Sequence, residues 1–282
     1  MKYVVRKAAR TGFCFGVKKA VETLEKVAQI RGRVEPLGAV VHNRQVMKRL
    51  SSLGVQVADS LDDITGNTVA IGAHGVSPEM ENEIRTRFSD VINTTCPFVQ
   101  RAQMTARRLS KSGFFVIIFG DGNHREVKGI LGWAENHGMA TLDTMQIQQL
   151  PSIPRRIGII SQTTQVPADF NRFAGEVFNL TYGKDSEIRI IDTICHDIRE
   201  RQQATIDLAK NDDLMLVIGS NTSANSNHLA KMCSAVTEAR LIESSEEISP
   251  SLLDGHHTIG VTGGASTDEA AIQEVIDTLK SF

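Results

Sequence analysis

The chain repeats one pattern of apolar and polar positions six times. In each copy, a short run of apolar and often β-branched residues ends in a loop rich in Gly, Ser, Thr, Asn and His, and a helical pattern follows. Short continuous apolar runs that end at glycine are typical of buried parallel strands. The pattern therefore predicts an α/β protein built on parallel sheets. The six strand-and-loop segments are residues 37–43, 69–75, 116–124, 157–163, 216–223 and 259–266.

Three of the four cysteines divide these copies into equal groups. Cys14, Cys96 and Cys195 stand at similar intervals, and two copies of the pattern follow each of them. We therefore expect three small α/β domains, residues 1–95, 96–194 and 195–282, around a common centre. Ligands of parallel α/β sheets usually bind beyond the carboxyl ends of the strands. If the three domains face inward, the six loops and the three cysteines line a single cavity.

Each of these three cysteines stands where a helix is expected to begin. A helix N-terminus stabilises a thiolate, which is the form of cysteine that binds metal. Three equivalent thiolates predict one shared iron–sulfur cluster, and three ligands to a four-iron cube would leave one iron open. The competing interpretation is three small buried side chains, the commonest role of cysteine. Cys233 lies inside an amphipathic helical pattern, and we assign it to the core.

Composition excludes several classes of function. The 282 residues include 31 basic and 33 acidic ones, and no block of Lys or Arg marks a nucleic-acid surface. The N-terminal residues lack the apolar stretch of a secretion signal, and the longest apolar runs are far shorter than the roughly 20 residues that span a bilayer. Four cysteines without close pairs do not resemble a secreted disulfide framework. We expect a cytoplasmic protein that binds neither nucleic acid nor membrane.

Three histidines occupy the same position in three copies of the pattern, the loop after the strand. They are His42, His74 and His124. A ring N–H can donate to a diphosphate oxygen, and we prefer that role. A zinc hydrolase could also use three histidines, but the close spacing of a His-x-x-x-His helix is missing. A single loop histidine is usually a surface residue, so the repetition is what indicates a site.

Two later loops are suited to an anion. Residues 223–226 (Ser-Ala-Asn-Ser) and 263–267 (Gly-Gly-Ala-Ser-Thr) each follow an expected strand and precede a helix. Hydroxyls, amides and backbone N–H groups can converge on an anion there, although ordinary N-capping explains these residues equally well. Neither loop is a Walker sequence or a Gly-x-Gly-x-x-Gly sequence. A nucleotide is therefore not the expected ligand.

Glu126 is the one carboxylate in a loop otherwise suited to anions. Near a diphosphate and in low-dielectric surroundings its pKa is expected to rise, which is what a proton donor at neutral pH requires. Taken alone, a solvated surface glutamate is the commoner outcome.

Together, the short motifs that carry these residues resemble the 4-hydroxy-3-methylbut-2-enyl diphosphate reductase family. They follow in order from about residue 10 to residue 270, and eight separate motifs would have to coincide by chance. The motifs are residues 11–17 (Thr-Gly-Phe-Cys-Phe-Gly-Val), 41–43 (Val-His-Asn), 73–78 (Ala-His-Gly-Val-Ser-Pro), 95–97 (Thr-Cys-Pro), 124–127 (His-Arg-Glu-Val), 162–164 (Gln-Thr-Thr), 192–195 (Asp-Thr-Ile-Cys) and 219–226, from Gly-Ser to Asn-Ser.

The resemblance implies a three-part α/β trefoil, pseudo-threefold around a central [4Fe–4S] cluster with one open iron. It implies reductive removal of the allylic hydroxyl of the substrate to give isopentenyl and dimethylallyl diphosphate, the last step of the non-mevalonate isoprenoid pathway. Electrons would come from a small carrier such as ferredoxin or flavodoxin. By the same resemblance, the cluster ligands are Cys14, Cys96 and Cys195, Glu126 delivers protons with His124 and Thr163 beside it, and the substrate lies against His42, His74, His124, Thr163, Ser223, Ala224, Asn225 and Ser266.

Several positions depart from the usual family pattern. After Cys195, where Tyr-Ala-Thr is common, residues 196–198 are His-Asp-Ile, so an isoleucine replaces a hydroxyl expected near the substrate. Ala224 replaces a common serine and Thr222 a common asparagine, while Asp121-Gly122 stands where a histidine is common. These departures motivate an alternative, a non-catalytic iron–sulfur sensor or diphosphate-binding module of the same fold. A zinc-dependent hydrolase is a third hypothesis.

Overall fold

The strands form three separate sheets, and every strand pair within them is parallel. The structure is a computed structural model that describes residues 3–41, 43–183 and 185–282. Contacts within the chain divide it into two compact units. The first unit comprises Met1–Lys18, Ala39–Ser52 and His196–Phe282, and the second comprises Lys19–Gly38 and Leu53–Cys195.

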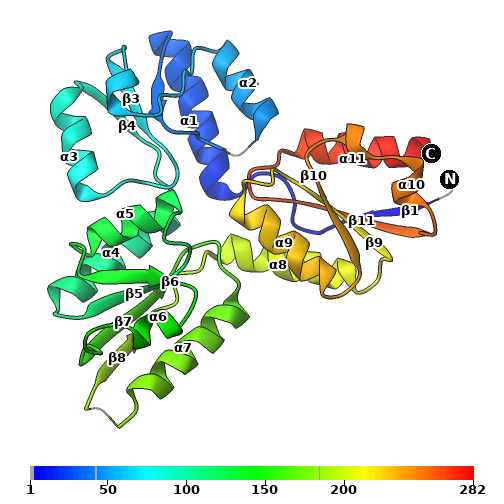
Figure 1. Ribbon diagram of the computed structural model, residues 1–282. Helices are drawn as coiled ribbons and strands as arrows, with labels where there is room; N and C mark the ends of the chain where they lie inside the picture. The colour runs from blue at the N-terminus through cyan, green and yellow to red at the C-terminus, as the bar shows by residue number, and fades with distance from the viewer. Residues whose placement is uncertain (1–2, 42, 184) are drawn as a thin grey trace. The chain divides into compact units, whose positions relative to one another are not determined.

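The first unit is built on a four-stranded sheet. Across the sheet, the strands are β1 (Val4–Lys7), β11 (Thr258–Gly263), β9 (Leu214–Ile218) and β10 (Glu238–Ile242) (Figure 1). The helices of this unit are α2 (Arg44–Ser52), α8 (His196–Ala209), α9 (Ala224–Ser234), α10 (Pro250–Leu253) and α11 (Glu269–Ser281), with a 3₁₀ helix at Ser245–Glu247.

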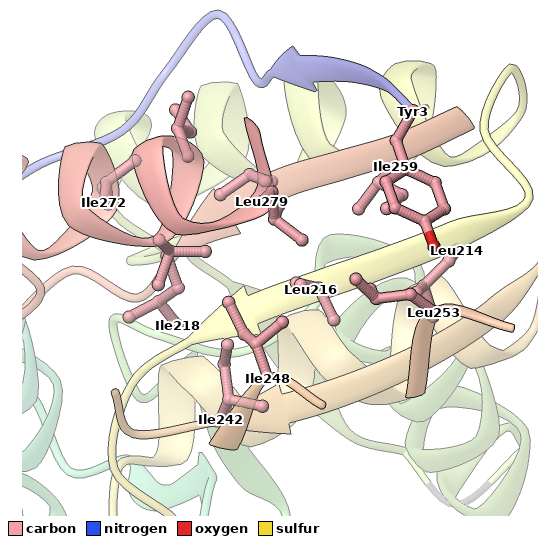
Figure 2. Packing of buried hydrophobic residues seen from close by; sticks show 13 residues of the cluster. Tyr3, Leu214, Leu216, Ile218, Ile242, Ile248, Leu253, Ile259, Ile272 and Leu279 are labelled. Carbon is pink, nitrogen blue, oxygen red and sulfur yellow. The ribbon is translucent and has the colours of Figure 1, made fainter. Parts of the chain in front are cut away.

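Strand β9 is buried on both faces because helices cover each of them. Leu214, Leu216 and Ile218 face α11, where Ile272 and Leu279 pack against them (Figure 2). The alternate residues of β9 face a second cluster, which contains Leu229 and Cys233 of α9. Each fully buried Leu or Ile contributes about 1.5–3 kcal/mol. Cys233 is completely buried, which confirms its assignment to the core.

The second unit contains another four-stranded sheet. Its strands, in order, are β6 (Gly138–Thr141), β5 (Phe115–Phe119), β7 (Arg156–Ser161) and β8 (Glu187–Ile190). Its helices are α4 (Pro97–Lys111), α5 (Arg125–Trp133), α6 (Met145–Gln148) and α7 (Pro167–Thr181). Helices α4 and α5 pack on one face of this sheet and α6 and α7 on the other, so β5 and β7 lie in a closed apolar environment (Figure 1).

A three-stranded sheet completes the second unit. Its order is β2 (Glu35–Leu37), β3 (Thr68–Ile71) and β4 (Asp90–Asn93). Helix α3 (Pro78–Arg87) places Ile84 against Val69 and Ile71, and a 3₁₀ helix lies at Leu61–Asp63. Helix α1 (Phe15–Arg31) begins in the first unit and continues into the second.

The parallel α/β class predicted from the sequence is confirmed. Five of the six predicted strand-and-loop segments contain a strand that ends in the expected loop: β3, β5, β7, β9 and β11. The first prediction was displaced, because β2 ends at Leu37, where the predicted run begins, and residues 38–41 are not in a strand. The strand pairing also places Val4–Lys7 beside Thr258–Gly263, so the first strand of the chain belongs to the sheet of the C-terminal part. The division at residues 95 and 194 remains a prediction. Among the described residues, the helices are too short or too polar to cross a bilayer.

Candidate functional site

Three cysteines stand at helix starts, as the sequence predicted. Cys14 immediately precedes α1, Cys96 is the N-cap of α4, and Cys195 immediately precedes α8. Cys195 is buried, whereas Cys14 and Cys96 are half-buried. The three thiols therefore share one local geometry, at the end of each helix where N–H groups point outward.

Backbone N–H groups point at two of these sulfur atoms. The Val17 N–H donates to Cys14 Sγ at 3.4 Å. Burial raises the pKa of the Cys96 thiol, and hydrogen bonds from the N–H groups of Phe98 and Val99 oppose that shift. N–H donors of this kind stabilise a thiolate and orient it toward a metal. These donor sets fit an iron–sulfur cluster.

The backbone N–H of each cysteine makes the same type of hydrogen bond. Each one donates to a carbonyl in a loop that follows a strand, and in every case that loop carries a candidate substrate residue. The pairs are Cys14 with Ala265 at 3.0 Å, Cys96 with Ala73 at 3.0 Å, and Cys195 with Thr163 at 2.9 Å. The carbonyl that Cys195 contacts belongs to the candidate residue Thr163 itself. The carbonyls that Cys14 and Cys96 contact belong to the residues immediately before the candidates Ser266 and His74.

The three cysteines divide between the two units. Cys14 belongs to the first unit, and Cys96 and Cys195 belong to the second. Within the part of the chain that the structure describes, neither unit holds three or more His, Cys, Asp or Glu side chains arranged for a metal ion.

Glu126 lies in the first turn of α5, and its side chain is almost completely buried. Thr163 donates to both carboxylate oxygens, from its N–H at 2.7 Å and from its hydroxyl at 2.9 Å. Burial raises the pKa of Glu126 to about 7, and the two Thr163 bonds limit the rise. The elevated pKa expected from the sequence is found, and its cause is burial.

His124 is the N-cap of α5, and its Nδ1 accepts the Glu126 N–H at 3.2 Å. That bond leaves Nε2 to carry the proton in the neutral ring. The His74 ring meets the His124 ring edge to face, with 5.3 Å between centroids. The structure thus brings His74, His124, Glu126 and Thr163 together within the second unit. His42 lies outside the described residues.

The loop at the start of α9 combines capping with unpaired polar groups. Ser223 is the N-cap, and its hydroxyl oxygen accepts the Ser226 N–H at 3.4 Å, so the capping interpretation is correct for that atom. Asn225 is 4 % exposed, yet its amide nitrogen and oxygen both lack a hydrogen-bond partner among the described residues, as does the Ser226 hydroxyl. Unpaired buried polar atoms are costly. Their presence in this loop fits a binding site for a polar group.

The residues that depart from the family pattern lie in different surroundings. Ile198 is buried on α8 and Ala224 is half-buried, whereas Thr222 is exposed and interacts with Ser220. Asp121 is exposed, and its side chain accepts the Asn123 N–H within the loop before His124.

One residue near the first unit's cysteine was missed by the sequence analysis. Arg201 is buried, and its guanidinium donates to the carbonyls of Gly12 and Gly263. A signal was available, because Arg201 falls on the buried stripe of α8 together with Ile198 and Thr205, at helical spacing. An arginine on such a stripe requires an internal partner.

Comparison with known proteins agrees with these findings. Residues 5–280 match the LytB protein family. A Dehalococcoides mccartyi protein named 4-hydroxy-3-methylbut-2-enyl diphosphate reductase is 52 % identical over 268 residues, covering 95 % of this chain and 94 % of that protein.

Two solved structures are similar over nearly the whole chain. The first is described as (E)-4-hydroxy-3-methyl-but-2-enyl diphosphate reductase, the terminal enzyme of the non-mevalonate pathway; its TM-score is 0.72 at 32 % identity, with 99 % of this chain and 100 % of that chain covered. The second, a reductase from Plasmodium falciparum, has a TM-score of 0.91 at 24 % identity, with 99 % and 89 % covered, and supports the fold alone. The family resemblance seen in the sequence is confirmed, and the chain belongs to the LytB protein family.

Proposed function

We propose that this chain is a 4-hydroxy-3-methylbut-2-enyl diphosphate reductase. The reaction breaks the allylic C–O bond, takes up two electrons and two protons, and releases water with isopentenyl or dimethylallyl diphosphate. One proton leaves with the hydroxyl oxygen, and the other is added to the carbon skeleton. The observation that carries the proposal is Glu126, a buried carboxyl with a pKa of about 7 that Thr163 holds by both oxygens.

Cys14, Cys96 and Cys195 would hold a [4Fe–4S] cluster and leave one iron without a protein ligand. Support comes from their common position at helix starts and from the N–H donors to Cys14 and Cys96. The chemistry that a bound cluster supplies is delivery of the two electrons. By the family resemblance, three α/β domains would surround this centre as a trefoil.

Glu126 would supply the proton. A carboxyl with a pKa near the working pH is present in both protonation states, which favours rapid proton donation and recovery. Thr163 fixes the position of the carboxyl, and the carbonyl of the same residue accepts the Cys195 N–H. The proton donor and one cluster ligand are therefore held by a single residue, with His124 capping the same helix turn.

The diphosphate would be bound by the residues that the family resemblance assigns to it: His42, His74, His124, Ser223, Ala224, Asn225 and Ser266. The unpaired amide of Asn225 supports this assignment, since a phosphate oxygen would accept its N–H. Binding the diphosphate at a fixed place positions the allylic hydroxyl, which converts binding energy into orientation. A ferredoxin or flavodoxin would supply electrons in the cytoplasm.

The test is turnover by anaerobically reconstituted protein with a strong chemical reductant. We expect the substrate to be consumed and both isoprenoid diphosphates to appear. Glu126→Gln should abolish turnover while the cluster absorption and substrate binding persist. Absence of product from protein with full iron and sulfide content would overturn the proposed reductase activity and favour the non-catalytic binding module. Zinc in the purified protein in place of iron and sulfide would overturn the assignment of an iron–sulfur cluster.

A further inference from the structure

Arg201 is the largest fully buried side chain of the described residues that carries a charge. Its Nη1 donates to the Gly263 carbonyl at 3.0 Å and its Nη2 to the Gly12 carbonyl at 2.9 Å. Asp197, one turn earlier on α8, lies 3.8 Å from Nη2, beyond hydrogen-bond distance. Two backbone carbonyls are therefore the main partners of this cation.

These two carbonyls belong to the two loops that meet at Cys14. Gly12 precedes Cys14 by two residues and has a positive φ of 75°, a conformation that favours glycine. Gly263 ends β11 and begins the loop that carries Ser266. The backbones of the two loops are also joined directly, by the 3.0 Å hydrogen bond from the Cys14 N–H to the Ala265 carbonyl. Arg201 thus adds a second connection between the same two segments.

The guanidinium also acts on Cys14 by charge. Burial lowers the pKa of Arg201, while the negative charges of Asp197 and of a Cys14 thiolate oppose that shift. An arginine stays protonated in proteins, so a permanent positive charge lies within electrostatic reach of this sulfur. The Arg10–Glu200 pair, at 2.6 Å, joins the same loop to α8 but is solvent-exposed, where ion pairs contribute little.

We infer that Arg201 is a positioning residue, which fixes the Cys14 loop against the loop of residues 263–266 and places a positive charge at the Gly12 carbonyl, two residues before Cys14. The inference rests on the proposed function for its purpose, because one loop would carry a cluster ligand and the other a diphosphate ligand. The hydrogen bonds that carry it do not depend on that function. Two parallel donors in a rigid fork suit arginine and cannot be reproduced by lysine, which has a single nitrogen.

Hydrogen exchange of the full-length chain, followed residue by residue, tests the positioning directly. In Arg201→Gln, we expect the amides of residues 12–15 and 264–267 to exchange about tenfold faster or more, because bonds to a charged donor are lost. Amides of β9 and β10 should keep their protection. Arg240→Gln is the matched control, since Arg240 is an exposed arginine of the same sheet that pairs with Glu238. Unchanged exchange at residues 12–15 in Arg201→Gln would overturn the inference.

Arg201→Lys covers the case in which the glutamine variant does not fold. It keeps the charge and loses the fork, so faster exchange confined to the two loops supports the inference, and equal acceleration throughout the sheet overturns it. A second measurement, the reduction potential of reconstituted protein, tests the effect of the Arg201 charge. We expect the potential to fall in Arg201→Gln and to stay close to wild type in Arg201→Lys. If the wild type binds a cluster but shows no turnover, the proposed function fails while both of these measurements still decide the role of Arg201.

Discussion

Thr163 holds both carboxylate oxygens of Glu126, one through its backbone N–H at 2.7 Å and the other through its hydroxyl at 2.9 Å. Both residues are buried, so no solvent competes for these bonds. The backbone donor is independent of the side chain, which allows the hydroxyl to be removed by itself. Its loss should raise the pKa of Glu126, since the hydroxyl donates to the ionised form.

Thr163→Val should lower turnover by about 10–100-fold, because Glu126 loses orientation and becomes harder to ionise after each proton transfer. The stability cost should be about 1 kcal/mol for one hydrogen bond. Steady-state rates across pH 6–9 measure the effect, and the part of the profile set by Glu126 should move to higher pH. Thr163→Ser keeps the hydroxyl and is the control. Equal losses in the serine and valine variants would mean that the methyl group matters more than the hydroxyl.

The raised pKa of Glu126 predicts how stability depends on pH. Its pKa is about 7 in the folded chain, against an ordinary 4.5. Between pH 4.5 and about pH 7, Glu126 keeps its proton in the folded chain and has lost it in the unfolded chain. The contribution of Glu126 to the free energy of unfolding therefore falls as pH rises through this range. The fall is complete above pH 7 and totals about 3 kcal/mol.

Urea unfolding at pH 5 and pH 8 measures this term, at matched cluster loading. Glu126→Gln should lose less stability between the two pH values than wild type, because glutamine does not titrate. Glu79→Gln, at an exposed position on α3, should behave as wild type does. Identical pH dependence in wild type and Glu126→Gln would show that Glu126 is ionised without penalty.

The sequence predicted the strands with continuous apolar runs and missed those with mixed ones. Strands β5, β7 and β9 are interior and almost wholly buried, so their sequences are continuous apolar runs, interrupted only at the ends of β7 by Arg156 and Ser161. Strands β8 and β10 lie at sheet edges, and exposed charged residues interrupt their patterns. An edge strand needs only one apolar side and one pairing partner, which leaves a weak signal in the sequence.

Local features of the site were predictable, and contacts between distant segments were not. The helix starts at the three cysteines follow from neighbouring residues, such as Pro97 at the first position of α4. The contacts of Glu126 with Thr163 and of Arg201 with Gly12 span 37 and 189 residues. Such pairings depend on the order of strands in the sheets, which no local pattern encodes.

Replacing any one of Cys14, Cys96 and Cys195 by serine should sharply reduce the iron and sulfide bound per chain, because serine is a poor substitute for a thiolate ligand. Cys233→Ala is the matched control. Burial raises the pKa of Cys233 to about 11, so its thiol stays protonated in the core and is not expected to bind metal. Metal and sulfide analysis after anaerobic reconstitution decides the matter. A serine variant with wild-type iron content would remove that cysteine from the ligand set.

Asn225→Leu should make the ligand-free protein more stable and abolish its response to a diphosphate. The amide of Asn225 is buried and has no partner in the part of the chain that the structure describes, and each such atom costs about 1–3 kcal/mol, which an apolar side chain of similar size avoids. Thermal unfolding with and without inorganic pyrophosphate tests both effects, and pyrophosphate should raise the midpoint of wild type but not of the variant.

Ser223→Ala provides the contrast, because loss of the α9 N-cap should lower stability by about 1 kcal/mol in the absence of ligand. If Asn225→Leu is stabilised by pyrophosphate as strongly as wild type, then this loop does not bind the anion, and its unpaired amide has another cause.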